Sequence, residues 1–350
     1  MPPSTCVVTG GAGFIGCALS GGLADRFDHV VALDNLHPQV HPRQERPAAL
    51  DPRVDLLVAD VTDAATWDAL LGRHTPQVII HLAAETGTGQ SLTEASRHGM
   101  VNVVGTTRML DGLVRHRQRP ERMLLASSRA VYGEGAWTDA AGAIHYPGQR
   151  SRAMLSAGRW DFPGLTPQPH DSARVHPAPT SVYAGTKLAQ EHLVTAWCLA
   201  MGVRPVLYRL QNVYGAGQSP TNPYTGIVTL FARLARSGAS IPVYEDGLMQ
   251  RDFVYVDDVS AALLCGLDVA PAEPDPPYDI GSGSSVTVLG LAQTLAAHFG
   301  APAPRVTGQF RDGDVRHASA TITAAQQALD WTPRVGLPEG IARLAEWLPR

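Results

Sequence analysis

The chain has 350 residues, which is enough for one large domain or two coupled domains with a sizeable core. Hydrophobic residues make up 44% and charged residues 17%, as in globular proteins, and a net charge of −4 does not favour nucleic acid or an anionic membrane as a partner. The sequence has no apolar run of about 18 residues and no basic, hydrophobic leader, so we expect a cytoplasmic protein. Its four cysteines stand far apart, which favours reduced packing residues and predicts neither a disulfide nor a metal site.

The first predicted elements are a strand at residues 5–8 and a helix that begins near Phe14, joined by the glycine-rich stretch TGGAGFIG at residues 9–16. A turn this tight needs residues that tolerate positive φ, and a phosphate can approach the backbone closely only where no Cβ intervenes. The free N–H groups at a helix N-terminus also attract phosphate. The stretch therefore predicts a dinucleotide site, with the cofactor held by Gly10, Gly13, Phe14, Ile15 and Gly16.

A second predicted strand, at residues 29–33, ends at Asp34, about 20 residues after the glycines. A carboxylate at this position accepts the ribose hydroxyls of adenosine and repels a 2′-phosphate, so we expect NAD rather than NADP. Asn35 follows it, and no arginine stands there to favour NADP.

A third predicted strand, at residues 54–59, ends at Asp60 and Val61. The Asp60 carboxylate has two possible roles, because it could reach the adenine amino group or cap the helix that starts near Asp63.

Two more strands are predicted at residues 77–82 and 123–126, separated by a long helix at 92–117 that contains Asn102. His81 lies inside the first of these strands, where we expect a hydrogen-bonded core histidine rather than a catalytic one. The alternation of strands and helices predicts an α/β fold with a doubly wound parallel sheet of the Rossmann type. Ligands bind beyond the carboxyl ends of such strands, which is where Ser128 falls.

The sequence also predicts a division into domains. Residues 1–210 form the dinucleotide-binding domain, to which residues 251–270 return, and residues 211–250 and 271–350 form a smaller C-terminal substrate-binding domain. Residues 134–179 interrupt the pattern with glycine, proline and isolated aromatic residues, so we expect an insertion or lid there.

Three residues suggest acid–base chemistry: Ser128, Tyr183 and Lys187. Among 28 basic residues Lys187 is the only lysine, and it lies four residues after Tyr183, on the same face of a predicted helix. Lowering a phenol pKa by about 3 units takes about 4 kcal/mol, roughly what one ammonium about 4 Å away supplies at an effective dielectric of about 20. We therefore expect Lys187 to turn Tyr183 into a base and Ser128 to orient the substrate hydroxyl. The alternative is an exposed helical pair without a catalytic role.

These stretches resemble the extended short-chain dehydrogenases/reductases of the nucleotide-sugar epimerase/dehydratase family. The matching stretches cover nearly the whole chain: TGGAGFIG, LDN (33–35), HLAA (81–84), SSRAVYG (127–133), the YxxxK of Tyr183 and Lys187, QNVYG (211–215), RDFVYVDD (251–258) and GDVRH (313–317).

The resemblance implies a tightly held NAD and a Ser–Tyr–Lys triad. It places Asp34, Asn35, Asp60, Val61, Leu82, Ala83, Ala84, Asn102, Tyr183 and Lys187 at the cofactor. It places Thr86, Ser128, Arg129, Asn212, Thr225, Arg251 and Arg316 at the substrate, with Asn212 and the two later arginines on the diphosphate or its ribose. Forked arginine donors suit phosphate, although each arginine could equally form a surface salt bridge. A homodimer through helices at about 92–117 and 181–200 is likewise an expectation from the resemblance.

The residues after Ser128 indicate which reaction of the family to expect. Family dehydratases carry an Asp–Glu pair there and decarboxylating members a Glu, whereas this chain has Arg129 and Ala130. Hydride removal from a carbinol and its return to the other face remain, which is epimerisation. The chain is most similar to 4-epimerases of dTDP- or UDP-linked deoxysugars. Some of these carry cysteines before the tyrosine that suggest zinc, but residues 134–179 contain none, so we expect no metal.

Two other functions stay open from the sequence. One is a nucleotide-sugar dehydrogenase or ketoreductase with net redox, which lasting NADH release would distinguish from an epimerase. The other is a non-catalytic NAD-binding scaffold, which predicts a broken triad, whereas the triad is intact.

Overall fold

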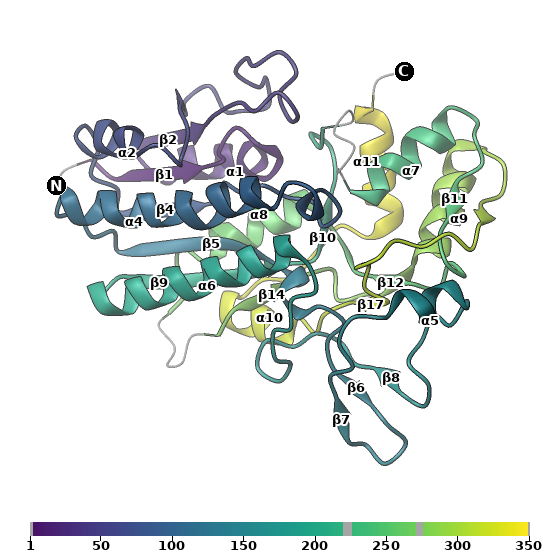
Figure 1. The fold of residues 1–350 in the computed structure, drawn as a ribbon. Helices are drawn as coiled ribbons and strands as arrows, with labels where there is room; N and C mark the ends of the chain where they lie inside the picture. The colour runs from purple at the N-terminus through teal and green to yellow at the C-terminus, as the bar shows by residue number, and fades with distance from the viewer. Residues whose placement is uncertain (1–2, 220–225, 271–275, 349–350) are drawn as a thin grey trace.

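The computed structural model describes residues 3–219, 226–270 and 276–348. Its main sheet has seven parallel strands in the order β14-β9-β5-β4-β1-β2-β3 (Figure 1). The strands are β1 (Thr5–Thr9), β2 (His29–Asp34), β3 (Asp55–Val58), β4 (Val78–His81), β5 (Arg122–Ser128), β9 (Arg204–Leu210) and β14 (Tyr278–Ile280). The strand order reverses between β1 and β4, and this switch point is where doubly wound sheets bind ligands. The predicted fold class is confirmed.

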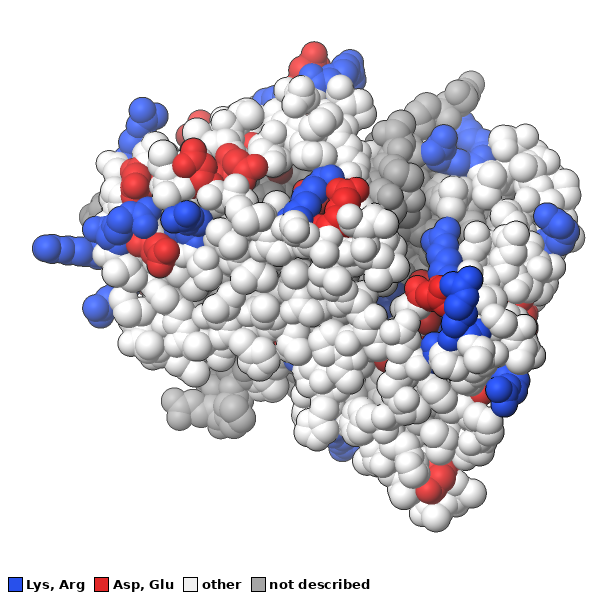
Figure 2. Space-filling model, viewed as in Figure 1, with Lys and Arg blue, Asp and Glu red and all other residues white. Residues whose placement is uncertain are grey.

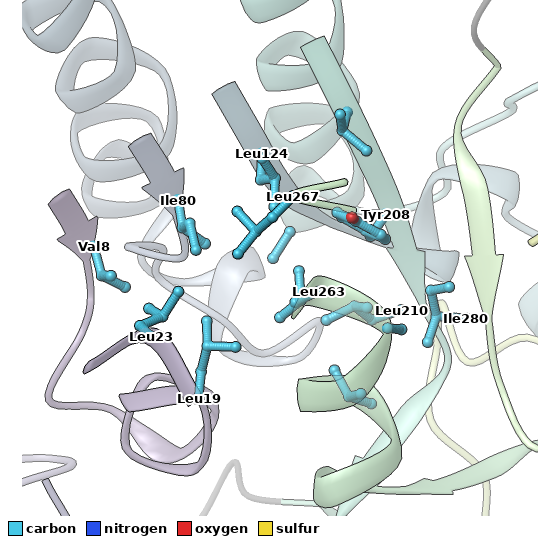
Figure 3. Close-up of a cluster of buried hydrophobic side chains, with 14 of the residues drawn as sticks. Val8, Leu19, Leu23, Ile80, Leu124, Tyr208, Leu210, Leu263, Leu267 and Ile280 are labelled. Carbon is cyan, nitrogen blue, oxygen red and sulfur yellow. The ribbon is translucent and has the colours of Figure 1, made fainter. Parts of the chain in front are cut away.

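The strands are apolar on both sides because helices cover both faces of the sheet. Alternate residues of β1 therefore enter different cores: Val8 packs with α1 and α8, whereas Val7 packs with α2 and α4. Figure 3 shows the first of these cores, in which Leu19 and Leu23 of α1 meet side chains from the sheet.

The helices of one face are α1 (Phe14–Ala24), α8 (Val256–Cys265) and α10 (Thr323–Leu329). Those of the other are α2 (Ala64–Leu71), α4 (Gly105–Arg115) and α6 (Val182–Met201), of which α4 and α6 lie in front of the sheet in Figure 1. The long helix expected at 92–117 is one continuous helical run over residues 95–115, made of α3 (Ala95–His98), the π-helical η2 (Gly99–Val104) and α4, and the 3-10 turn η1 (Gln90–Leu92) precedes it.

A smaller part of the chain packs around its own core, which includes Phe231, Phe253, Leu291 and Leu344. Its helices are α7 (Ile227–Arg236), α9 (Val288–Phe299) and α11 (Leu337–Trp347). Its strands are β10 (Asn212–Tyr214), β11 (Pro242–Val243), β12 (Gln250–Arg251), β13 (Phe253–Tyr255), β15 (Val286–Thr287), β16 (Arg305–Val306) and β17 (His317–Ala318).

Two elements differ from the predicted domain boundary at residue 271. The strand β14 pairs with β9 in the main sheet, and α10 packs on the same core through Ala325 and Leu329. Both were expected in the substrate-binding domain. The reason is tertiary: the edge of β9 needs a partner strand, and residues far along the chain supply it.

The segment at residues 134–179 is folded and lies beside the smaller part of the chain (Figure 1). It contains β6 (Trp137–Thr138), β7 (Ile144–His145), α5 (Arg152–Ser156) and β8 (Thr166–Pro167), and the 3-10 turn η3 (Arg129–Tyr132) immediately precedes it. The three strands form a small antiparallel sheet.

All four cysteines are free, and Cys6 and Cys198 are buried. Over the residues that the structure describes, no helix is both long and apolar enough to cross a membrane.

Candidate active site

A cavity of about 160 Å³ lies at the carboxyl ends of β1, β2 and β4, at the switch point of the sheet. It brings together most residues predicted for the cofactor, namely Gly10, Gly13, Asp34, Asn35, Asp60, Val61, Leu82, Ala83 and Ala84. Thr86, predicted for the substrate, lines the same cavity.

The glycine turn is shaped by close backbone approaches. Gly10 has φ of +65°, and a Cβ on it would lie 2.8 Å from the backbone nitrogen of Ala83. A Cβ on Gly16 would lie 2.4 Å from the Gly11 carbonyl oxygen, so only glycine lets α1 start this close to the turn. Phe14 and Ile15 do not line the cavity, because their side chains pack in the hydrophobic cores. They can offer only backbone N–H groups to a phosphate.

The acidic side of the cavity suits a ribose rather than a 2′-phosphate. The Asp34 carboxylate accepts the backbone N–H groups of Ala12 (3.1 Å) and Leu36 (2.9 Å), which hold it at the end of β2. Asn35 donates to Asp60 (3.0 Å), and Asp60 also accepts from Thr62. Asp63, not Asp60, caps α2 through the Ala65 N–H. With a glycine cradle and two carboxylates, the lining of this cavity suits the adenosine and diphosphate of NAD.

Asn102 lies apart from this cavity, which corrects its predicted role. It is fully buried in η2, where its side chain exchanges hydrogen bonds with the backbone N–H and C=O of Glu85 (2.8 and 3.0 Å) and donates to Thr186 (2.9 Å). All its polar atoms are therefore occupied. Asn102 shapes the segment after β4 and ties it to α6, a role that depends on contacts across the fold.

The catalytic candidates meet where β5 ends and α6 begins. Ser181 caps α6 by accepting the Ala184 N–H (3.1 Å), which places Tyr183 in the first turn. Ser128, the last residue of β5, accepts the Ala130 N–H (3.1 Å). Burial raises the pKa of Tyr183, while hydrogen bonding to Ser128 and the positive charge of Arg129 oppose this. The serine and the phenol are thus brought together as expected.

Lys187 lies in a buried polar network, one helical turn after Tyr183 on α6. Its ammonium donates to Gln190 (2.6 Å) and is fully buried, and burial lowers its pKa to about 7. Burial raises the pKa of Tyr183, and the positive charge of Arg129 is one of the interactions that oppose this rise. The expectation counted only residues near in sequence, but the fold brings an arginine from another segment to the phenol.

A chain of buried hydrogen bonds holds the lysine in place. Gln190 also donates to Thr106 (2.9 Å), and Thr106 contacts His81 (2.9 Å). His81 is fully buried, and burial lowers its pKa to about 3, so its ring stays neutral. It is the hydrogen-bonded core histidine that the sequence predicted.

A second cavity, of about 470 Å³, lies between the loop after β4 and the smaller part of the chain. One wall is apolar, and its residues include Phe231, Leu234, Pro242, Met249 and Val288. The polar wall carries Tyr244, Arg311 and Asp314, and the Arg311 guanidinium lies 5.2 Å from the centre of the Tyr244 ring. Residues 84–86 line the first cavity and residues 87–89 the second, so the two are neighbours.

Two arginines near Tyr183 are available to an anion. Arg129 donates to the Asn212 side chain (2.9 Å), and Arg251 donates to the backbone oxygens of Gln250 and Val315. Among the described residues, neither forms an ion pair. Burial, together with the nearby Arg251, lowers the pKa of Arg129 to about 9. Two cations this close, one buried and the other half-buried, favour an anionic ligand.

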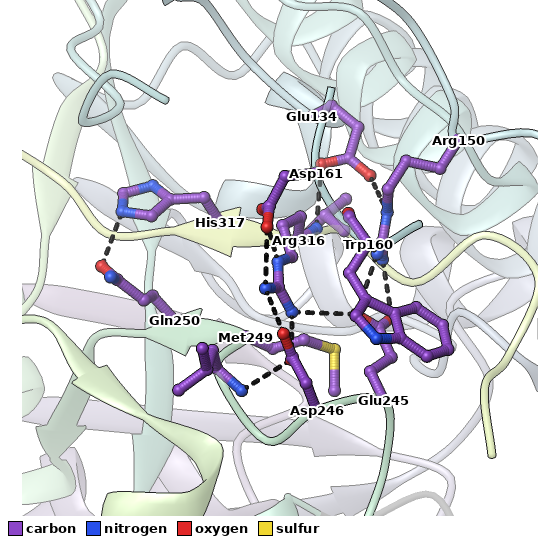
Figure 4. A network of polar contacts seen from close by, with 12 residues as sticks. Glu134, Arg150, Trp160, Asp161, Glu245, Asp246, Met249, Gln250, Arg316 and His317 are labelled. Atoms are coloured by element: carbon purple, nitrogen blue, oxygen red, sulfur yellow. Dashed lines mark hydrogen bonds and ion pairs between the residues drawn. The ribbon is translucent and has the colours of Figure 1, made fainter. Parts of the chain in front are cut away.

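Arg316 is not available to a diphosphate, which corrects its predicted role. Its guanidinium is held by Asp161, Glu245 and Asp246 at 2.7–3.1 Å (Figure 4). In the same network Arg150 bridges Glu134 (3.0 Å) and Glu245 (2.9 Å). Sequence could not foresee this, because Asp161 and Arg150 come from the 134–179 segment, whose placement no local pattern predicts.

The residues of the polar wall were not predicted from the sequence. Arg311 lies two residues before the motif GDVRH, and Asp314 lies within it. Thr225, predicted for the substrate, lies outside the described residues.

A second polar network connects β5 and α6, which carry Ser128 and Tyr183, to β9. Glu191 of α6 accepts from Ser127 (2.5 Å) of β5 and from two nitrogens of Arg209 (3.0 and 2.7 Å) of β9. Arg209 lies 4.7 Å from the centre of the Tyr132 ring, and the Tyr132 hydroxyl lies 2.9 Å from both carboxylate oxygens of Asp279. Burial raises the pKa of Asp279 to about 7.

Replacing Asp279 with asparagine should change how stability depends on pH. The folded protein keeps a proton on Asp279 that the unfolded chain releases above about pH 4, so this group's stabilising contribution is lost as pH rises through about 7. Between about pH 5 and about pH 8, wild type should lose roughly 2–3 kcal/mol relative to Asp279→Asn. Urea unfolding at several pH values measures this, and a difference that does not vary with pH would contradict it.

Among the described residues, no group of three or more His, Cys, Asp or Glu side chains is placed to hold a metal ion.

Comparison with known proteins agrees with this site. A model of the NAD dependent epimerase/dehydratase family matches residues 6–281. A dTDP-L-rhamnose 4-epimerase of Burkholderia thailandensis is 57% identical over 342 residues, 98% of this chain and 94% of that protein. The UDP-glucose 4-epimerase of Thermotoga maritima with UDP-glucose has a TM-score of 0.79 at 26% identity, over 98% of each chain. That of Thermus thermophilus in complex with NAD has a TM-score of 0.78 at 25% identity, over 98% of each.

The chain belongs to the NAD-dependent epimerase/dehydratase family, within the short-chain dehydrogenase/reductase superfamily. It is an NAD-dependent nucleotide-sugar 4-epimerase, which confirms the predicted cofactor and activity.

Proposed function

We propose that this enzyme interconverts C4 epimers of a dTDP-linked 6-deoxyhexose, with dTDP-L-rhamnose as the first candidate. The observation that carries the proposal is the 57% identity to a dTDP-L-rhamnose 4-epimerase over 98% of the chain. Other family members act on UDP-sugars, so the base and the sugar are the points that need a test.

The proposed mechanism uses Tyr183 as the proton acceptor for the C4 hydroxyl. Bound NAD would supply the hydride acceptor and donor for C4, so that removal from one face of the sugar and return to the other is redox-neutral. Ser128, which contacts the phenol, orients the hydroxyl and shares its proton. Arg129 favours the ionised form of Tyr183, and Gln190 accepts a hydrogen bond from Lys187 on the same helix. Tyr183 then returns the proton to the C4 oxygen, so its own protonation state is the same before and after one turnover.

The residues after Ser128 support epimerisation over dehydration. Arg129 donates to Asn212 (2.9 Å), and Ala130 has no titratable group, so the acid–base pair that would remove water is missing from this stretch of sequence. The ketone formed at C4 can then only be reduced again. Reduction from one face regenerates the substrate, and reduction from the other face gives the C4 epimer.

We place the nucleoside diphosphate in the 470 Å³ cavity. Its apolar wall suits a base, and Arg311 and Asp314 on the other wall suit a phosphate and a ribose hydroxyl. Arg129 and Arg251 lie near Tyr183 and would meet the diphosphate close to the sugar.

Replacing Arg311 with alanine should weaken dTDP binding about 10- to 100-fold, because a charged hydrogen bond contributes roughly 1.5–3 kcal/mol. The effect should appear in KM, with kcat nearly unchanged, since Arg311 lies away from Tyr183. Titration calorimetry with dTDP measures the affinity. Arg305→Ala, at an exposed position of β16, is the matched control and should bind normally. Equal affinities for the two variants would move the nucleotide out of this cavity.

We also propose a homodimer formed through α4 and α6. The surface over α6 carries few charged side chains in Figure 2, and Leu199 is 69% exposed while Val114 is 50% exposed. A cavity of about 600 Å³ between these helices is lined by Leu110, Leu193 and Trp197, among others. Paired copies would cover this face.

The free cysteines support a location in the reducing cytoplasm.

The purified enzyme should be incubated with dTDP-, UDP-, GDP- and CDP-sugars without added cofactor, and followed by NMR and by absorbance of NADH. Conversion of dTDP-L-rhamnose to its C4 epimer without lasting NADH is the expected result. Faster turnover of a UDP-sugar would overturn the proposed substrate, and stoichiometric NADH with an oxidised sugar would indicate a dehydrogenase instead.

A further inference from the structure

Two segments border the cofactor cavity from opposite sides. The strands β2 and β4 lie on either side of β1, so the segments that follow them leave the sheet on either side of the glycine turn. Residues 35–41 follow β2, and residues 82–86 follow β4, and both line the cavity. Arg97 of α3 lines it as well.

Arg97 joins these two segments. Its guanidinium pairs with Glu85 (2.8 Å) on the β4 side and with Glu94 (2.8 Å), which lies three residues before it at the start of α3. The same guanidinium donates to His37 (3.3 Å) and to Gln39 (3.4 Å) on the β2 side. It therefore spans the cavity from one bordering segment to the other.

A second contact runs parallel to the first. The Gln39 and Gln90 side chains exchange hydrogen bonds through their amides (3.1 and 3.2 Å), and Gln90 also donates to Glu94 (3.1 Å). Gln90 is buried, with 2% of its surface exposed, so this pair is not an incidental surface contact. Together these side chains form a polar bridge, defined by His37, Gln39, Glu85, Gln90, Glu94 and Arg97.

We propose that this polar bridge closes over bound NAD and that Arg97 sets how slowly the cofactor leaves. The inference rests on the proposed placement of NAD in this cavity. A hydride removed from the sugar must return from the same cofactor molecule. Loss of the reduced cofactor during turnover would therefore leave the sugar oxidised at C4. A dinucleotide lying under the bridge can leave only after Arg97 breaks its contacts either with Glu85 or with His37 and Gln39.

The ordinary alternative is a surface ion pair without a function. The Arg97 side chain is 29% exposed and that of Glu85 is 15% exposed, so solvent weakens each contact. A guanidinium shared among four side chains, three of them in the two bordering segments, is nevertheless more constrained than an isolated pair. The alternative predicts no change in cofactor retention when Arg97 is removed, which makes the two readily distinguishable.

The test measures NAD itself, apart from activity. Wild type and Arg97→Ala are purified alike, and the release of bound NAD is followed by exchange against isotopically labelled NAD and mass spectrometry. Arg97→Ala should release NAD roughly ten-fold faster, equivalent to about 1.4 kcal/mol, and should contain less NAD after dialysis. Arg97→Lys, which keeps the charge but not the fork, should fall between. Arg115→Ala, which breaks an exposed pair with Asp68, is the matched control and should exchange like wild type.

A further variant separates this inference from the placement of NAD. Asp34→Ala removes the carboxylate at the end of β2 and should abolish NAD retention. If Asp34→Ala retains NAD normally, the cofactor is not in this cavity, and the placement fails. If Asp34→Ala loses NAD while Arg97→Ala exchanges at the wild-type rate, the placement stands and the polar bridge is refuted.

Discussion

Replacing Tyr183 with phenylalanine is expected to lower kcat about 1,000-fold, because the variant keeps the ring but loses the group placed to take the C4 proton. Burial raises the pKa of Tyr183, which disfavours the ionised phenol, so ionisation depends on neighbouring groups. Ser128 and Arg129 supply the opposing interactions. The measurement is the initial rate of epimerisation by NMR, together with the NAD content of each preparation.

Two comparisons make this result specific. NAD content and dTDP affinity should stay at wild-type levels in Tyr183→Phe, because the phenol oxygen is absent from both cavity walls. Tyr146→Phe, which removes the hydroxyl of an exposed tyrosine in the 134–179 segment, should retain full activity. A Tyr183→Phe enzyme with more than about a tenth of wild-type kcat would show that another group accepts the proton.

Replacing Arg150 with alanine is expected to lower the free energy of unfolding by about 3–5 kcal/mol, because it removes the cation that pairs with the buried Glu134 and leaves Glu245 with Arg316 alone. The side chain of Arg150 is 1% exposed and contacts Glu134 and Glu245, which are buried to a similar degree. It also donates to the backbone oxygens of Trp160 and Asp314 (3.1 and 2.8 Å). Since Asp314 lines the larger cavity, nucleotide affinity should fall with stability.

Arg152→Ala provides the matched control two residues away. Arg152 pairs with Asp312 on the surface, where its side chain is 76% exposed, and such pairs contribute about 0–1 kcal/mol. Urea unfolding of both variants gives the comparison. Similar free energies for Arg150→Ala and Arg152→Ala would mean that the network in Figure 4 adds little to the stability of the fold.

The cofactor half of the site could be predicted from sequence because its parts are local. Gly10, Gly13 and Gly16 lie in one turn, and Asp34 closes the next strand, which pairs directly with β1. The parallel sheet then brings the ends of β1, β2 and β4 together without any further choice. The YxxxK spacing likewise places Tyr183 and Lys187 on one face of α6 whatever else the chain does.

The partners of these residues were decided only by the tertiary structure. Asp161, which lies 155 residues before Arg316, forms an ion pair with it, so the Arg316 guanidinium is occupied. Arg129 adds a positive charge beside Tyr183, and the Asn102 side chain accepts the backbone N–H of Glu85. Local sequence determines backbone conformation and the face on which a side chain lies, through sterics and periodicity. Charge partners follow from distances across the folded chain, because Coulomb interactions and burial depend on separation in space and not in sequence.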